Sequence, residues 1–380
     1  MIVLTRIEGG LKRVNHAAVA VNEHIYSFGG FAGTEDYSFD RPIDVYTLDM
    51  NTLRWEEIRP SDGGNPANVP CIRYGHTVVA QDDIIYLWGG GKNKVLCNKM
   101  FMFDTNTRSW LANEVKGEIP VARDGHSACT SGGFMYIIGG FEEERREFAD
   151  TVYRFEFRTR TWQHLYLLSS DLLKKDFMSC VAIDDIIYLF GGRTYPCPFY
   201  DSEIMELDTD RMRLTKTEVS GYKPCGRRSH TAVVVNNKMM IFGGYNDVVN
   251  EHLNDFHIFD PEKRQWEPVA VSGDTRPTAR RRHCCVAVNS YLYIFGGSCP
   301  APEAAGALEH YLMELDDLYV IDTERSLRSM SLQAVIDHDL DTRRLPPALR
   351  REVECYRTDN RLACTQVEVL DLAMHAKRPP

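Results

Sequence analysis

The sequence has no long hydrophobic segment, no closely paired cysteines and no excess of positive charge, and each absence argues against a class of protein. Apolar runs such as Ile84–Trp88 have the length of a strand and are too short to cross a membrane. The first residues lack the basic start, apolar core and cleavage site of a secretory signal. The net charge of -10 argues against wholesale binding of nucleic acid. We therefore expect neither a membrane nor a nucleic acid as a direct partner.

The 11 cysteines are scattered and include no Cys-x-x-Cys pair. Cys129 and Cys180, for example, lie inside apolar runs that read as strands. This distribution favours free thiols in a reducing compartment over a disulfide framework, so we predict a cytoplasmic and nuclear protein. The sequence also shows no nucleophile–base motif and no phosphate-binding glycine loop. We therefore expect no cofactor, no bound metal and no catalytic residues.

What the sequence does contain is a repeat. A hydrophobic run ends in a Gly-Gly pair six times, and the intervals between successive pairs are 60, 50, 52, 52 and 53 residues. The pairs stand at 29–30, 89–90, 139–140, 191–192, 243–244 and 296–297. A period of about 50 residues is that of a propeller blade with four strands.

Other landmarks keep phase with the glycine pairs. A histidine lies 13 residues before the pair in five repeats, at His16, His76, His126, His230 and His283, and Met178 takes its place in the fourth. A tryptophan opens the last strand in four repeats, at Trp55, Trp110, Trp162 and Trp266, with Leu214 in the fourth. Alternating strands, glycines suited to positive φ and a large apolar plug serve the packing of successive blades. This combination resembles the kelch family.

The resemblance implies an all-β fold, a six-bladed kelch β-propeller spanning residues 1–323. The sixth repeat has no tryptophan strand after Asp322. The segment Val3–Ile7 precedes Glu8-Gly9-Gly10 much as a last strand precedes the next repeat. We therefore predict that the N-terminal strand completes the last blade, which leaves no unpaired edge in the ring.

Basic residues recur three positions before the repeat histidine or its equivalent, and six-fold repetition predicts a positive ring near the axis. They are Arg13, Arg73, Arg123, Lys175, Arg227 and Arg280. The alternative is that each one bonds loop carbonyls or neighbouring acids and holds the blades together. Arg193, Arg228 and Arg281 are not required by the repeat, and we predict that these extra arginines bind a carboxylate or phosphate. Arg282 is a further arginine next to Arg281.

Acidic residues accompany this basic set. Asp124 and Asp176 each follow a residue of the basic ring, and Glu142 follows the third glycine pair. They either contact a cationic side chain next to the bound anion or neutralise the arginines. The predicted ligand site therefore comprises Arg193, Arg228, Arg227, Arg123, Arg73, Arg280, Arg281, Asp124, Asp176 and Glu142.

Beyond the repeats, residues 324–355 read as a helical extension and 356–380 as a tail. Leu327, Ser331 and Val335 at i, i+4 and i+8 predict an amphipathic helix capped by Ser326. Pro346-Pro347 opens a second helical segment. The extension resembles an Elongin-binding box followed by a Cullin-2 box, with Leu327, Ser331 and Val335 in the first and Leu345, Pro346, Leu349 and Val353 in the second. Ser331 stands where that box usually has cysteine. The alternative is a helical tail packed against the propeller.

Propeller and extension together resemble the kelch domain-containing substrate receptors of Cullin-2 RING ubiquitin ligases. The motifs that carry this likeness include Arg13–His16, Arg123–Cys129 and Arg227–His230. The resemblance implies binding to Elongin B/C and Cullin-2, and capture of proteins by a C-terminal glycine whose carboxylate is held by arginines. Arg193 and Arg228 match that family's pocket positions, whereas the loop 194–198 lacks a second family arginine.

Two other functions stay open from the residues. An enzyme of the kelch type would need converging metal or radical ligands, but the recurrence of histidine at one position in five repeats favours a structural hydrogen bond. A non-catalytic scaffold for cytoskeletal or chromatin partners would show no Elongin binding and no preference for free C-termini. Ser331 is the residue that keeps the scaffold hypothesis open.

Overall fold

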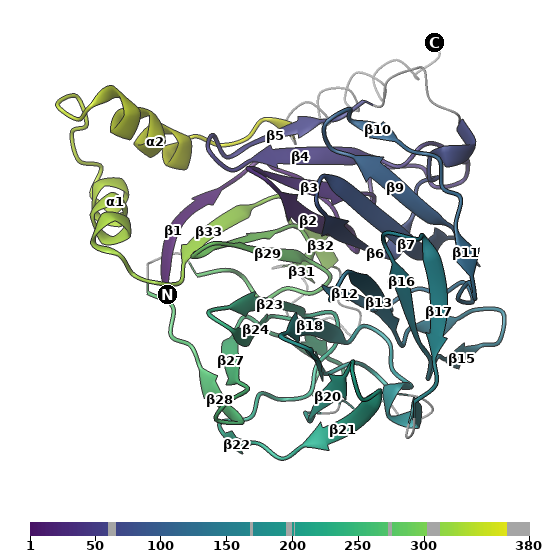
Figure 1. The fold of residues 1–380 in the computed structure, drawn as a ribbon. Helices are drawn as coiled ribbons and strands as arrows, with labels where there is room; N and C mark the ends of the chain where they lie inside the picture. The colour runs from purple at the N-terminus through teal and green to yellow at the C-terminus, as the bar shows by residue number, and fades with distance from the viewer. Residues whose placement is uncertain are drawn as a thin grey trace, which may run out of the picture.

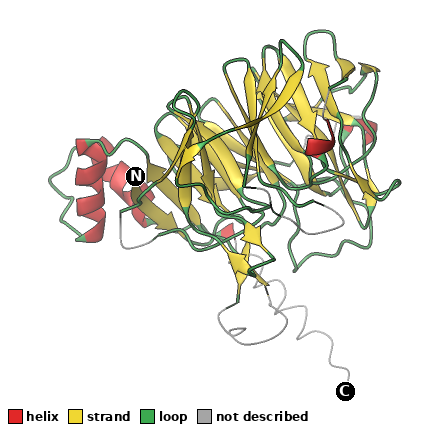
Figure 2. Ribbon diagram, turned by 90° about the horizontal axis from the view of Figure 1, so that it is seen from below, coloured by secondary structure: helices red, strands yellow, loops and turns green. Residues whose placement is uncertain are grey.

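The computed structural model describes residues 1–59, 66–167, 170–194, 200, 202–272, 276–301 and 312–362. Six antiparallel sheets stand around one central axis, and Figure 1 shows them as a closed ring. The prediction of a six-bladed β-propeller is confirmed. The two longer helices stand at one edge of the strand-built body (Figure 2). Within the described ranges, no helix is long and apolar enough to span a membrane.

The first three blades follow the order of the sequence, and each runs from the axis outward. Blade 1 contains β2 (Ala17–Val21), β3 (His24–Phe28), β4 (Val45–Asp49) and β5 (Arg54–Glu57). Blade 2 contains β6 (Tyr74–Gln81), β7 (Ile84–Lys92), β9 (Met100–Asp104) and β10 (Ser109–Trp110), with β8 (Val95–Leu96) beside β7. Blade 3 contains β12 (Ser127–Ser131), β13 (Phe134–Ile138), β16 (Val152–Glu156) and β17 (Thr161–Leu165), with β11 (Lys116–Gly117) parallel to β17.

The last three blades repeat this order, with one exception. Blade 4 contains β18 (Ser179–Ile183), β19 (Ile186–Phe190), β20 (Ile204–Asp208) and β21 (Arg213–Thr217). Blade 5 contains β23 (Thr231–Val235), β24 (Lys238–Phe242), β27 (Phe256–Asp260) and β28 (Gln265–Pro268), with β22 (Ser220–Gly221) parallel to β28. Blade 6 contains β29 (Cys284–Val288), β30 (Tyr291–Phe295), β33 (Leu318–Asp322) and, as the exception, the N-terminal β1 (Ile2–Ile7).

Strand β1 closes the ring, as predicted. It pairs antiparallel with β33, placing Val3 opposite Ile321 and Arg6 opposite Tyr319. Blade 6 is thus built from both ends of the repeat region, and β33 has no unpaired edge.

The core lies between neighbouring blades. Each outer-strand tryptophan packs on the aromatic residue that precedes the glycine pair of the blade before it. The ring centroids are 4.9–5.8 Å apart in the four pairs Trp55–Phe295, Trp110–Phe28, Trp162–Trp88 and Trp266–Phe190. All four tryptophans are buried. The predicted inter-blade plug is therefore present at four of the six junctions between neighbouring blades.

A second set of contacts closes the ring at the axis. One residue per blade, just before the repeat histidine or its equivalent, has a positive φ of 51–70°. Its backbone N–H donates to the carbonyl of the same position in the preceding blade, at 2.7–3.2 Å. The six positions are Asn15, Gly75, Gly125, Phe177, Ser229 and Arg282, and the six bonds form a complete cycle. We call these residues the backbone ring; it narrows one end of the channel.

Short hairpins follow several glycine pairs on the side of the backbone ring. They are β14 (Phe141–Glu142) with β15 (Glu147–Phe148), β25 (Tyr245–Asn246) with β26 (Glu251–His252), and β31 (Ser298–Pro300) with β32 (Leu312–Glu314). Two 3-10 turns, η1 (Pro66–Asn68) and η2 (Ser170–Leu173), lie in loops.

The extension contains α1 (Leu327–Asp337) and α2 (Pro347–Arg357), which pack on β1 at the outer edge of blade 6 (Figure 1). The Ser326 side chain caps α1 by accepting from the Ser329 N–H at 3.0 Å, and Pro347 occupies the first turn of α2. After α2, the Asn360 N–H donates to the Glu8 carbonyl at 2.8 Å, and Asn360 Oδ1 accepts from the Trp55 N–H at 3.2 Å. These bonds fix the extension to β1 and blade 1. Residues 363–380 of the predicted tail lie outside the described residues.

Candidate functional site

A pocket of about 420 Å³ lies at the channel mouth, on the side of the backbone ring. Its floor is formed by Asn15, Phe177 and Arg282, three residues of that ring. The other lining residues are Val14, Phe31, Tyr74, Asp124, Phe141, Asp176 and Arg193. The pocket therefore combines an aromatic wall with two carboxylates and two guanidinium groups.

The backbone ring places two large side chains in this floor. Phe177 and Arg282 have φ of 51° and 57°, a conformation that residues other than glycine adopt rarely and at a cost. The Phe177 ring lies over Gly125, where a Cβ would come within 3.2 Å of it. The Arg282 guanidinium stands 5.6 Å from the centre of the Phe177 ring. Glycine at 125 thus leaves room for Phe177, and Phe177 supports Arg282.

Arg228, Arg281 and Arg282 form a cluster of positive charge that the surrounding acids satisfy only in part. Arg228 Nε donates to the Tyr200 hydroxyl at 3.2 Å, and its Nη2 lies 3.7 Å from Asp247 Oδ2. The Nε atoms of Arg281 and Arg282 are buried and have no hydrogen-bond partner among the described residues. Burial, reinforced by Arg281 and Arg228, lowers the pKa of Arg282 to about 10. Arg282 therefore stays charged at pH 7, and the cluster favours an added anion.

Arg193 is engaged with an acid on the pocket wall. Its Nη2 and Nε donate to the two oxygens of Asp176 at 2.5 and 3.2 Å. Backbone hydrogen bonds between Arg193 and Asp176 run beside this ion pair. The Asp176 side chain is buried, and burial raises its pKa although Arg193 opposes the shift. Arg193 therefore lines the pocket as predicted, but as half of an ion pair.

Asp124 lies next to this ion pair without an ion-pair partner of its own among the residues described. Burial is the main reason that its pKa is raised to about 6, and the charges of Asp176 and Glu143 raise it further. A carboxyl group in this state accepts a proton readily near neutral pH. Asp124 and Asp176 are both pocket residues, as expected from the sequence.

The prediction of a positive ring near the axis is wrong, because these basic side chains do not surround the axis. Arg73, Arg123, Arg227 and Arg280 are 0–5% exposed and point into the blades. Each donates through Nη1 to the carbonyl of the first glycine in its own Gly-Gly pair, at 3.1–3.2 Å. Arg13 and Lys175 are buried as well. These side chains therefore hold the blades together, which is the alternative that the sequence left open, and they do not reach a ligand at the mouth.

Acidic side chains form ion pairs with these buried arginines. Arg280 forms two bonds to Asp317, at 2.8 and 3.1 Å, and Arg227 forms two to Asp255, at 2.6 and 2.8 Å. Arg123 donates to Glu142 at 2.6 Å, and Glu142 is 2% exposed. The prediction that Glu142 contacts a ligand is therefore wrong, because this carboxylate neutralises Arg123 inside blade 3.

The repeat histidines serve the contacts between blades. His126, His230 and His283 share a hydrogen bond of 2.7–2.9 Å with a hydroxyl of the preceding blade, from Thr77, Ser179 and Thr231 respectively. Burial lowers the pKa of His230 to about 3, so its ring is neutral. These three histidines thus bridge neighbouring blades, whereas the ring nitrogens of His16 and His76 are buried without a hydrogen-bond partner among the described residues. No group of three or more potential metal ligands occurs within the described ranges.

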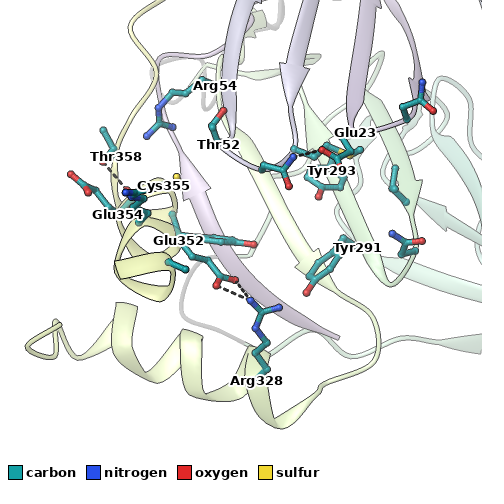
Figure 3. Close-up of a pocket in the computed structure, with 18 residues that line it drawn as sticks. Glu23, Thr52, Arg54, Tyr291, Tyr293, Arg328, Glu352, Glu354, Cys355 and Thr358 are labelled. Atoms are coloured by element: carbon teal, nitrogen blue, oxygen red, sulfur yellow. Dashed lines mark hydrogen bonds and ion pairs between the residues drawn. The ribbon is translucent and has the colours of Figure 1, made fainter. Parts of the chain in front are cut away.

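A larger cleft of about 840 Å³ lies at the opposite ends of the strands, between α2 and the turns of blades 1 and 6 (Figure 3). Arg328 and Glu352 meet in this cleft through two hydrogen bonds of 3.0 and 2.8 Å. Its walls also contain Tyr291, Tyr293 and Tyr356. The channel-mouth pocket is the better candidate for an anionic ligand, because Arg282 in its floor has a buried Nε without a hydrogen-bond partner among the described residues. Arg228 and Arg281 lie beside Arg282 but do not line the pocket themselves.

Helix α1 is not amphipathic as predicted, because its apolar residues lie on more than one face. Two of them are exposed to solvent, Leu327 at 81% and Met330 at 49%, and Ser331 is exposed one turn after Leu327. Val335 is half-buried. On the second segment Leu349 is 40% exposed, Pro346 is exposed and Leu345 is half-buried, whereas Val353 packs inward. Most residues of the two predicted boxes therefore remain available to a partner.

Sequence reasoning missed part of the pocket. The predicted site does not include Arg282, although the sequence shows it as an extra arginine, and it does not include the aromatic wall. That wall consists of Phe31, Tyr74, Phe141 and Phe177. One signal was available: the position just before the repeat histidine differs in every blade except blades 2 and 3, where it is glycine. The second family arginine has no counterpart to observe, since residues 195–199 lie outside the described part of the chain.

Comparison with known proteins places this geometry in a family. A family model described as the KLHDC2/KLHL20/DRC7 Kelch-repeats domain matches residues 75–297. Kelch domain-containing protein 3 of Homo sapiens is 37% identical over 370 residues, covering 94% of this chain and 96% of that protein, and the Rattus norvegicus protein is equally similar. Host cell factor homolog hcf-1 of Caenorhabditis elegans is 24% identical over 284 residues, covering 68% of this chain and 35% of that protein.

Proposed function

This chain belongs to the kelch-repeat family that includes kelch domain-containing protein 3, and we propose that it is a non-catalytic substrate receptor of a Cullin-2 RING ubiquitin ligase. In this role the channel-mouth pocket captures a protein by a C-terminus that ends in glycine. The extension binds Elongin B/C and Cullin-2. The protein would act in the cytoplasm and nucleus, because these compartments are reducing and keep cysteine thiols free.

One observation carries the proposal: the buried Nε atoms of Arg281 and Arg282 have no partner among the described residues, and Arg228 stands beside them. Guanidinium groups bind carboxylates through paired, charge-assisted hydrogen bonds. Burying a hydrogen-bond donor without an acceptor costs free energy. A ligand carboxylate that supplies the missing acceptor should therefore bind this cluster more strongly than it would bind a guanidinium group in water. The overall charge of -10 makes this local excess of positive charge distinctive.

The shape of the pocket supports a chain terminus over a larger anion. Phe177 and Arg282 narrow the floor, which suits a terminal residue without a side chain. Asp124 and Asp176 on the same wall would oppose a ligand with several negative charges, such as a phosphate group. A terminal carboxylate has a single charge, and the residues before it can lie against the aromatic wall.

The exposed face of α1 supports the ligase connection. Leu327 and Met330 face solvent on a helix that is held to the propeller from its other side. An apolar helix face of this kind is suited to insertion into a partner groove. The fixed attachment through Asn360 would keep the extension at a constant position relative to the pocket.

A non-catalytic scaffold is the second candidate, and Ser331 in place of the usual cysteine is the observation that favours it. Size-exclusion chromatography of the full chain with Elongin B/C and Cullin-2 separates the two. Co-elution that is lost in Leu327→Asp supports the receptor. Failure of the wild-type chain to co-elute supports the scaffold.

The pocket is tested by measuring the affinity for a peptide that ends in Arg-Gly with a free carboxylate. Arg228→Gln and Arg281→Gln should each weaken binding by about tenfold or more, since a hydrogen bond to a charged group contributes about 1.5–3 kcal/mol. Arg211→Gln is the matched control, because Arg211 is 79% exposed on the outer part of blade 4 and pairs with Asp208. Equal affinities in all four proteins would place the peptide elsewhere.

A further inference from the structure

Ser331 differs from the two other serines of α1 and its cap. Ser326 caps the helix, and Ser329 is the residue of α1 that is buried against the propeller. Ser331 is exposed, and its hydroxyl donates to the Leu327 carbonyl one turn earlier, at 2.7 Å. Its oxygen is therefore on the solvent side, one turn after the exposed Leu327 and next to the exposed Met330.

The sequence around Ser331 also sets it apart. Arg328 stands three residues before it, and no other serine in the chain has a basic residue at that position. Arg325 lies three residues further upstream. Protein kinases select substrates by charge patterns near the acceptor, and an arginine three residues before the serine is the pattern that basic-directed serine kinases read.

Helix α1 is able to open enough for a kinase to bind it. A kinase takes its substrate in an extended form, so the helix must unwind locally around Ser331. Helix α1 has 11 residues, of which Ser329 is the buried one. Isolated helices shorter than about 12–15 residues are marginal in water, and segments with few buried contacts open at low cost.

We propose that Ser331 is a phosphorylation site that controls whether the α1 face binds its partner, an inference that rests on the proposed ligase function for its consequence. In the reaction, a serine kinase transfers the γ-phosphoryl group of ATP to Ser331 Oγ. The bond between the γ-phosphorus and the β,γ-bridging oxygen breaks, the Oγ–P bond forms, the hydroxyl proton passes to the kinase's base and ADP leaves.

The phosphate changes α1 in two ways. It brings about -1.5 to -2 charges onto the apolar face, one turn from both Leu327 and Val335, where a partner groove would have to desolvate it. It also stands one turn from Arg328, which now binds Glu352 of α2 through two bonds of 3.0 and 2.8 Å (Figure 3). The phosphate competes with Glu352 for this arginine and loosens the contact between α1 and α2. No residue of α1 lines the channel-mouth pocket, so peptide capture is unaffected.

The first experiment tests the modification itself, without reference to Elongin. The full chain is incubated with Mg-ATP and a calmodulin-dependent serine kinase, and the phosphate is located by mass spectrometry. We expect one phosphate on Ser331 and at least a tenfold slower reaction in Arg328→Ala. Arg325→Ala should react normally, and so should Glu352→Gln, which breaks the ion pair but keeps Arg328. A chain that is not phosphorylated at Ser331, or an Arg328→Ala variant that reacts normally, overturns the proposal.

The second experiment tests the consequence by measuring the affinity for Elongin B/C. The phosphorylated chain and Ser331→Glu should bind at least tenfold more weakly than wild type, and removal of the phosphate by a phosphatase should restore the wild-type affinity. All variants should bind the Arg-Gly peptide equally. Undiminished Elongin binding by the phosphorylated chain refutes the switch alone. Absence of binding by unmodified wild type refutes the ligase function, while the kinase experiment still decides whether Ser331 is a modification site.

Discussion

At the scale of single residues, the basic side chains divide according to whether the repeat requires them. Four arginines at the recurring position, Arg73, Arg123, Arg227 and Arg280, are buried and donate to a glycine carbonyl of their own blade. The arginines that occur once, Arg228, Arg281 and Arg282, gather at the mouth. Repetition in a propeller sequence therefore marks structure, and departure from repetition marks the site.

Arg280 provides a test of the structural group. Arg280→Ala removes two bonds from Asp317, which is 1% exposed and keeps only the longer bond of 3.3 Å from Arg6 among the described residues. Breaking a buried ion pair from one side costs about 3–5 kcal/mol, and we expect a loss of that size in the free energy of unfolding. Urea unfolding followed by tryptophan fluorescence measures it, with exposed Arg211→Ala expected to change the value by less than about 0.5 kcal/mol. A loss no larger than the control would show that the buried pair is not needed.

Asp124 predicts how stability depends on pH. Its pKa is raised to about 6 by burial and by neighbouring acids, above the ordinary value of 3.8. The folded protein thus binds the proton more tightly than the unfolded chain, so this group's contribution to stability is present below about pH 4 and is lost as the pH rises through about 6.

The measurement is the thermal midpoint of Asp124→Asn against wild type at several pH values. The substitution should raise the midpoint at pH 7.5 and change it much less at pH 4, where the wild-type carboxyl is protonated in the folded state and partly protonated in the unfolded chain. A stabilisation that is the same at both pH values would show that the ionisation of Asp124 is not its cause.

At the scale of elements, the strand pattern was predictable because each blade repeats it in phase with a glycine pair. The first glycine of a pair faces the next blade: at Gly89, φ is +76° and a Cβ would collide with the His126 ring of blade 3. This contact explains why a histidine and a glycine pair recur together. Their spacing of 13 residues reflects the hairpin within one blade, in which His76 pairs with Gly89. The same repeat also predicted the role of the N-terminal strand and the positions of the tryptophans between blades.

Gly132 and Gly89 allow the two costs of replacing a glycine, backbone strain and steric collision, to be measured separately. Gly132 has φ of +56° with nothing within 4 Å of its Cβ position, so Gly132→Ala should lose about 1–2 kcal/mol of unfolding free energy through backbone strain alone. Gly89→Ala adds the collision with His126 and should lose about 1–3 kcal/mol more. Urea unfolding of both variants checks this order. Equal losses would mean that the inter-blade contact at Gly89 contributes little.

At the scale of the whole molecule, two closures hold the propeller together and one attachment holds the extension. Strand β1 closes the outer edge, and the backbone ring closes the axis. Asn360 then ties the end of α2 to both β1 and blade 1. The end of α2 is thus fixed to the same ring that carries the pocket, which suits the proposed receptor.

The sequence predicted the fold more completely than the site, for a physical reason. Blade structure depends on residues that recur, and six copies make the pattern visible in one chain. The pocket depends on single side chains brought together from different blades, such as Phe177 with Arg282. Their contact arises from the backbone ring, whose left-handed conformation has no fixed residue type. A single sequence therefore indicated a basic mouth but not which arginines are buried in the blades and which lie at the mouth.

The measurement that tests the central claim most directly compares one peptide in two forms. A peptide ending in Arg-Gly with a free carboxylate, and the same peptide with an amidated C-terminus, are titrated into the full chain by calorimetry. We predict tight binding of the acid and at least a tenfold weaker interaction for the amide, because the arginine cluster at the channel mouth binds the terminal charge. Equal affinity for the two forms, or binding of neither, would contradict the receptor function.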